Sequence, residues 1–108
     1  MKRFDETYRF LTGMYHDGYF PDFLVDKIRA ELENMVAFLE TGVSDLGQIQ
    51  EKFDRMTMAI NDLQEEFEEN GSEIETVARD SIATDVDKIL KWFDVNLNVD
   101  DAIGERDW

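Results

Sequence analysis

Side chains able to do chemistry gather in one run of carboxylates past the middle of the chain. Between residues 62 and 75 the sequence has seven acidic residues and no basic one. The seven are Asp62, Glu65, Glu66, Glu68, Glu69, Glu73 and Glu75. Carboxylate oxygens at this density can bind a divalent cation, or they can pair with the side chains of a basic partner. The run is therefore the first candidate site.

Part of the run has the spacing of a metal-binding helix. Residues 65–69 read Glu-Glu-Phe-Glu-Glu, which contains the EExxE pattern with which all-helical nucleotide pyrophosphatases hold magnesium. Carboxylates on two helices can clamp a metal ion that bridges phosphates. Such a site needs an ExxD pair on the next helix, whereas Glu75 and Asp80 are five residues apart and lie on different faces. The alternative hypothesis is therefore a metal-dependent hydrolase of nucleotides or phosphates, using Glu65, Glu66 and Glu69 with Glu75 or Asp80.

A second set of oxygen ligands has the spacing of a calcium-binding loop. Asp94, Asn96, Asn98 and Glu105 occupy positions 1, 3, 5 and 12 of an EF-hand pattern. Position 6 requires a glycine with a positive φ, and this sequence has Val99 there. An extended segment with alternating apolar side chains explains the same residues. The sequence favours that extended segment over a calcium site.

His16 is the only histidine, and no Ser-His-Asp or Cys-His triad can be assembled around it. It follows a predicted helix and precedes Asp17, where a surface or capping role is expected. Tyr15, Tyr19 and Phe20 surround it, and this aromatic loop is expected at the edge of the core, with a recognition patch as the other interpretation. Cysteine is absent, which excludes disulfides and thiolate chemistry. No residue is therefore assigned a catalytic role.

Amphipathic segments must position these side chains. Apolar residues recur every three or four positions and predict four helices, over residues 5–15, 21–41, 45–70 and 73–93. Gly42 and Gly71 stand where the second and third helices are expected to end, and glycine is the preferred residue directly after a helix. The apolar stripe of residues 73–93 changes direction near residues 83–85, so the sequence does not decide whether this segment forms one helix or two. The predicted fold class is all-α, an antiparallel bundle of four to five helices with an extended C-terminal strap.

Local signals refine the ends of the last helix. Ser72 and Glu75 have the spacing of a capping box, in which each side chain accepts from the other residue's amide. From residue 94 apolar and polar residues alternate, which predicts the strap, with a single helical turn at about 100–103.

The apolar residues over 46–67 keep a strict three-four alternation. This pattern is typical of a coiled-coil seam or of one face of a bundle. The bundle is favoured because the neighbouring helices have complementary stripes that need a partner. The seam could still be shared between chains, so the sequence does not predict an oligomeric state.

The composition limits the classes of partner. The chain has 108 residues and a formal net charge of −15, and its length predicts one domain, residues 1–108. Such a charge repels nucleic-acid backbones and anionic membranes, so neither is expected as a partner. No apolar stretch could span a bilayer, and the first residues lack the apolar region of a signal peptide. A cytoplasmic location is expected.

Three blocks of the sequence resemble those of a known protein family. Residues 14–21 read Met-Tyr-His-Asp-Gly-Tyr-Phe-Pro, and Leu-Val-Asp-Lys follows at 24–27. The second block runs from Leu63 to Glu75 and on to Asp80, and the third is Arg-Asp-Trp at 106–108. Together they resemble a family of small, acidic, helical bacterial proteins of unknown function. The resemblance implies a stand-alone helical domain, and it supplies no activity and no catalytic residue.

Charge and site together predict a function. The chain is expected to be a non-enzymatic acidic interaction protein that binds and blocks a basic protein partner, such as a toxin or a nuclease. The run of carboxylates from Asp62 to Glu75 would supply the complementary charge. No cofactor is expected, apart from a divalent metal under the alternative hypothesis.

Overall fold

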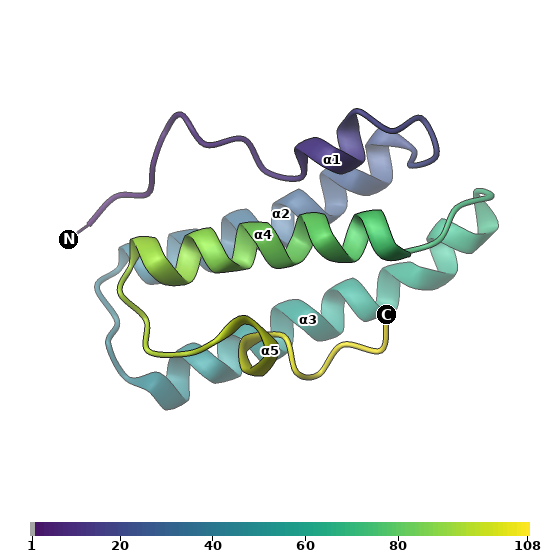
Figure 1. Cartoon of the computed structure of the whole chain (residues 1–108). Coiled ribbons are helices and arrows are strands. Elements are labelled where there is room, and N and C mark those ends of the chain that lie inside the picture. Colours follow the sequence, from purple (N-terminus) through teal and green to yellow (C-terminus); the bar gives the residue numbers. More distant parts are fainter. Residues whose placement is uncertain (1) are drawn as a thin grey trace.

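Helices and the loops that join them make up the whole of the described chain, residues 2–108 of a computed structural model (Figure 1). The helices are α1 (Thr12–Tyr15), α2 (Asp22–Glu40), α3 (Leu46–Glu69), α4 (Thr76–Trp92) and α5 (Val99–Ala102). Within these residues there is no strand. The all-α class predicted from the periodicity is confirmed, with three long helices and two single turns.

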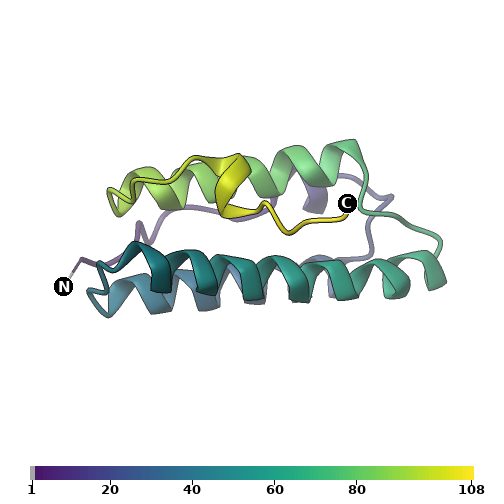
Figure 2. The same ribbon diagram turned by 90° about the horizontal axis from the view of Figure 1, so that it is seen from below.

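The long helices lie alongside one another (Figures 1 and 2). The loop at residues 41–45 returns the chain so that α3 packs antiparallel on α2. Helix α4 also packs on α2, and α5 contacts both α3 and α4. The extended strap therefore inserts its one helical turn between α3 and α4, as Figure 1 shows.

The core is built from the predicted apolar stripes. Helix α2 buries Leu24, Val25, Ile28, Leu32, Met35, Val36 and Leu39. Helix α3 buries Ile49, Phe53, Met56, Thr57, Ile60 and Phe67, and helix α4 buries Ala78, Ile82, Asp85, Val86, Ile89 and Leu90. From Ile49 to Phe67 the seam thus faces the other helices of its own chain, as the bundle interpretation expects, whereas Leu46 at its start is exposed. Residues 76–92 form one continuous helix, which answers the question of one helix or two.

Each long helix ends at a residue in the left-handed region. Gly42 has φ 88°, Gly71 has φ 73° and Asp94 has φ 54°. After α3 the Gly71 amide donates to Glu68 O (3.1 Å) and the Ser72 amide donates to Phe67 O (2.9 Å). These two bonds make a Schellman motif, which satisfies carbonyls that the helix end would otherwise leave open. The predicted stops at both glycines are confirmed.

The predicted capping box is wrong. The Ser72 amide already donates to Phe67 O, so it is not free to receive the Glu75 carboxylate. The Ser72 hydroxyl is buried without a hydrogen-bond partner, and α4 begins only at Thr76. The Ser72 amide can serve either the C-terminal motif of α3 or the capping box of α4, and in the structure it serves α3.

The predicted helix over 5–15 is also wrong for most of its length, because α1 covers only Thr12–Tyr15. The preceding segment is held by side chains of α4. The Asp85 carboxylate accepts from the Leu11 amide (2.7 Å) and from the Tyr8 hydroxyl (2.6 Å), and Trp92 Nε1 donates to Arg3 O (2.9 Å). Leu11 takes a left-handed conformation there, with φ 58°. These tertiary contacts outweigh the local helical periodicity.

The strap forms as predicted, with a helical turn one residue earlier than expected. Val95, Leu97 and Val99 are partly buried against the core. Asn98 Oδ1 accepts from the Asp101 amide (2.8 Å) and so caps α5.

The Schellman glycine gives a first prediction. Replacing Gly71 by Ala should lower the free energy of unfolding by about 1 kcal/mol, because φ 73° is costly for any residue with a Cβ. No atom lies within 4 Å of the added Cβ, so the cost is in the backbone alone. Urea unfolding should show the loss. Gly18→Ala is the matched control, since its Cβ also has open space and its φ is not positive, and equal losses for both variants would contradict the argument.

Candidate functional site

The acidic run lies at one end of the bundle. It covers the last turns of α3, the α3–α4 loop and the N-cap of α4, at the end where α1 also lies (Figure 1). Five of its side chains are exposed, with no ion pair or hydrogen bond within residues 2–108: Asp62, Glu65, Glu68, Glu69 and Glu73. The other two differ, because Glu66 and Glu75 are partly buried. The run therefore presents mostly uncompensated negative charge.

Glu66 has a cationic neighbour from α2. Its Oε2 lies 2.6 Å from Lys27 Nζ. The same Nζ lies 5.9 Å from the centre of the Phe23 ring, one helical turn earlier. Lys27 thus places the start of α2 directly beside the end of α3.

Exposed aromatic side chains accompany the carboxylates at this end. Phe23 is 49% exposed and Tyr19 is 43% exposed. Tyr19 precedes α2 and packs edge-on against the buried Phe20, with ring centres 5.1 Å apart. The expectation that the aromatic loop lies at the core edge holds for Phe20, whereas Tyr19 points out. We call the whole set the acidic end surface: Tyr19, Phe23, Asp62, Glu65, Glu68, Glu69 and Glu73.

Sequence reasoning identified the carboxylates of this surface and missed Phe23. The signal was present, because Phe23 stands beside the apolar stripe of α2 rather than on it. A large aromatic residue off the stripe of an amphipathic helix has no core to enter.

The negative charges in the last turn of α3 interact unfavourably with the dipole of the helix. Glu68 and Glu69 stand at its C-terminal end, and that turn contains no basic residue. A helix C-terminus carries partial negative charge, so these anions lower local stability. This placement leaves the acidic end surface less stable than a neutral one.

Neutralising those two anions should stabilise the protein. For Glu68→Gln with Glu69→Gln, we expect the free energy of unfolding to rise by about 0.3–1 kcal/mol per residue at low salt. Thermal unfolding at low and high ionic strength measures the gain and its screening. Glu51→Gln is the control, because Glu51 lies near the start of α3 and pairs with Arg55 (2.7 Å), so its loss should not stabilise. A lower melting temperature for the double variant would contradict the dipole argument.

The metal candidates are not brought together. Within residues 2–108 no group of three or more His, Cys, Asp or Glu residues lies close enough to hold a metal ion. In the EExxE pattern, Glu65 and Glu69 are exposed while Glu66 pairs with Lys27. Glu75 and Asp80 do not join them in such a group.

The residues of the predicted calcium loop have other roles. Asp94 is the left-handed residue that ends α4, and Asn98 caps α5. Asn96 and Glu105 are exposed. Two of the four oxygen donors are therefore used in helix ends, which explains their spacing without a cation.

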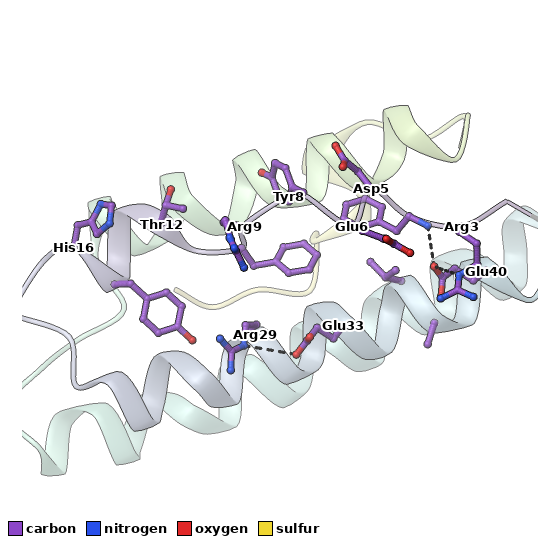
Figure 3. A pocket seen from close by; sticks show the side chains of 15 residues that line it. Arg3, Asp5, Glu6, Tyr8, Arg9, Thr12, His16, Arg29, Glu33 and Glu40 are labelled. Atoms are coloured by element: carbon purple, nitrogen blue, oxygen red, sulfur yellow. Dashed lines mark hydrogen bonds and ion pairs between the residues drawn. The ribbon is translucent and has the colours of Figure 1, made fainter.

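A groove of about 720 Å³ lies between the N-terminal segment and α2 (Figure 3). His16 lies at one end of it, and Arg3 and Glu40 lie at the other. Tyr15 forms part of its wall and donates to Asp26 Oδ1 (2.5 Å). Burial and this carboxylate raise the pKa of the Tyr15 hydroxyl to about 12. Tyr15 is therefore a neutral donor at physiological pH.

Asp85 is the one acidic side chain buried in the described core. Burial raises its pKa to about 6, although the hydrogen bonds from Tyr8 and Leu11 favour the ionised form. Burial and Asp85 also raise the pKa of Tyr8 above its usual range. Asp85 forms one wall of a shallow depression with Tyr8 and Thr84, and its hydrogen bonds hold the N-terminal segment.

None of the described helices is both long enough and apolar enough to cross a membrane. Comparison with family models matches residues 4–108 to a family described as a family of unknown function (DUF5713). Neither the curated proteins nor the solved structures give a match. The match confirms that the chain belongs to a family of unknown function, as the resemblance of the three sequence blocks implied.

Proposed function

We propose a function for a chain that belongs to the DUF5713 family of unknown function: it is a non-enzymatic, acidic protein that binds a basic protein partner. Its binding site would be the acidic end surface, and its action would be to block the partner, as an inhibitor or an immunity protein does. The proposal places it in the cytoplasm of a bacterium. The observation that carries it is the pair of half-exposed aromatic rings, Tyr19 and Phe23, at the same end of the bundle as the unpaired carboxylates.

The physical argument rests on how interfaces divide their roles. Aromatic side chains at the centre of an interface supply most of the affinity, and charges at the rim set orientation and association rate. Phe23 and Tyr19 offer two such anchors, and five exposed carboxylates offer the rim. The destabilising position of Glu68 and Glu69 supports this assignment, since a solely structural helix end would favour cations there.

The partner can be isolated by comparison of matched variants. In the end variant Glu65, Glu68, Glu69 and Glu73 are replaced by Gln. In the control variant Asp94, Asp100, Asp101 and Glu105 are replaced by Asn or Gln, which removes the same four charges elsewhere. We expect one basic protein from source-cell lysate to be retained by the wild type and the control and lost from the end variant. Retention of the same proteins by all three would contradict the proposal.

The alternative, a metal-dependent hydrolase of nucleotides or phosphates, predicts a different result. Titration calorimetry with Mg²⁺, Mn²⁺ and Ca²⁺ should give saturable micromolar binding that Glu65→Gln and Glu69→Gln abolish. The proposed interaction function predicts only weak, salt-screened association, because the carboxylates do not converge. A micromolar site at these glutamates would favour the hydrolase.

A further inference from the structure

The groove between the N-terminal segment and α2 is lined by charges of both signs, with three arginines and the four carboxylates of Asp5, Glu6, Glu33 and Glu40. Three of the six arginines line it: Arg3, Arg9 and Arg29. At about 720 Å³ it has the volume of a small-molecule site, for which about 300–1,000 Å³ is usual.

Two of these guanidinium groups have unused hydrogen-bonding capacity. Within residues 2–108 Arg9 makes no ion pair and no hydrogen bond. Arg29 makes only long ion pairs, 3.6 Å to Asp26 and 3.7 Å to Glu33. A guanidinium has five N–H donors in a planar fork that matches a carboxylate. Arg9 and Arg29 therefore offer donors that the protein itself does not satisfy.

The charges are ordered along the groove, as Figure 3 shows. Arg9 reaches from the N-terminal segment toward α2, where Arg29 stands. Farther along, Glu33 on α2 and Glu6 on the N-terminal segment bring negative charge. One part of the groove thus attracts an anion and the next part attracts a cation.

The walls between these charges are aromatic. Arg29 Cζ lies 5.6 Å from the centre of the Tyr15 ring, which orients the guanidinium. Phe10 also lines the groove and stacks on Phe4, with ring centres 5.6 Å apart. These rings offer apolar contact to a short aliphatic chain between two charged ends.

We propose that this groove binds a small dipolar molecule that has a carboxylate at one end and an ammonium group at the other. The carboxylate would lie between Arg9 and Arg29, and the ammonium group would lie at Glu33 and Glu6. A dianion of the same length is disfavoured, because its second carboxylate would meet those two glutamates. This site is separate from the acidic end surface and does not depend on it.

Three probes of similar length test the charge pattern: 4-aminobutyrate, butyrate and succinate. Each is titrated into the ¹⁵N-labelled full chain at low ionic strength, and the backbone amide shifts of Arg9, Thr12 and Arg29 are followed. We expect saturable shifts at these amides, with 4-aminobutyrate binding most tightly and succinate least tightly. The absence of saturation for 4-aminobutyrate up to about 20 mM, an affinity too weak for a specific site, would overturn the proposal.

Variants then assign the two ends. Arg9→Gln should weaken 4-aminobutyrate binding about tenfold or more, because a charge-assisted bidentate contact is lost. Glu33→Gln should reduce the preference for 4-aminobutyrate over butyrate, because only Glu6 then remains to face the ammonium group. Arg79→Gln is the control, since Arg79 is exposed on α4 and does not line the groove, and it should bind as the wild type does. Equal effects of Arg9→Gln and Arg79→Gln would show nonspecific charge attraction and overturn the site.

Discussion

Replacing Asp85 by Ala is expected to lower the free energy of unfolding by about 2–3 kcal/mol at pH 7. The carboxylate is 3% exposed and accepts two hydrogen bonds, from the Leu11 amide and the Tyr8 hydroxyl. Without it both donors lose their acceptor in a buried place. The Leu11 amide has no alternative partner among the described contacts. Urea unfolding measures the loss.

Asp85→Asn separates the hydrogen bonds from the charge. The amide keeps one oxygen for the Leu11 N–H, and its NH₂ group can donate to the Tyr8 hydroxyl oxygen. We therefore expect Asp85→Asn to remain within about 1 kcal/mol of the wild type at pH 7. A loss as large as that of Asp85→Ala would show that the charge itself, rather than the hydrogen bonds, holds the N-terminal segment.

The same residue predicts a pH dependence of stability. Burial raises the pKa of Asp85 to about 6, against 3.8 for an ordinary aspartate. Between about pH 4 and 6 the native state therefore binds a proton that the unfolded state does not. The stabilisation from this group is complete below about pH 4 and is lost as the pH rises through about 6. The loss is on the order of 3 kcal/mol.

The pH profiles of the wild type and Asp85→Asn should differ in slope within this window and run parallel outside it. Their unfolding free energies should converge toward pH 7.5 and diverge toward pH 4.5, where only the wild type gains. Asp5 acts below this window, because hydrogen bonds from Thr7 lower its pKa, so its stabilisation is lost only as the pH falls further. Parallel pH profiles for the two proteins would contradict the role given to Asp85.

Periodic features of the sequence predicted the helices and their ends. The stripes of α2, α3 and α4 enter one core, and Gly42 and Gly71 end their helices with positive φ. These signals depend on neighbours within a few residues, which the sequence displays directly. Asp94 plays the same part after α4, where the sequence allowed a calcium ligand, favoured the extended strap and did not predict a helix-ending residue. An aspartate tolerates the left-handed region, so the residue type alone could not separate the two roles.

Contacts between distant residues could not be predicted in the same way. The segment before α1 has a helical pattern, yet Asp85, more than 70 residues away, holds it in another conformation. The groove forms because the segment before α1 takes this conformation. The sequence therefore could not predict that Arg9 and Arg29 line one groove. Phe23 and the carboxylates lie at the same end of the bundle for a similar reason, since the ion pair of Lys27 and Glu66 holds the start of α2 beside the end of α3. The charge of the candidate site was predictable from the sequence, whereas the exposed aromatic side chains at the same end follow from the tertiary structure.

The second large effect is expected at the acidic end surface. Four rim contacts of about 0.5 kcal/mol each give about 2 kcal/mol, so the end variant should bind the captured partner about 30-fold more weakly. Phe23→Ala should cost a similar amount or more, since Phe23 is the more exposed anchor. Both variants should remain folded, because these side chains lie outside the core. The charge variant should act mainly through the association rate and lose its effect at high salt.

The most direct test is the dissociation constant of the captured partner, measured by titration calorimetry for the wild type, the end variant and the control variant. The end variant and the control variant lose the same net charge and differ only in where it is lost. We predict about 30-fold weaker binding for the end variant and less than about threefold for the control. Equal weakening of both would mean that net charge alone attracts the partner, and it would contradict a binding site at the acidic end surface.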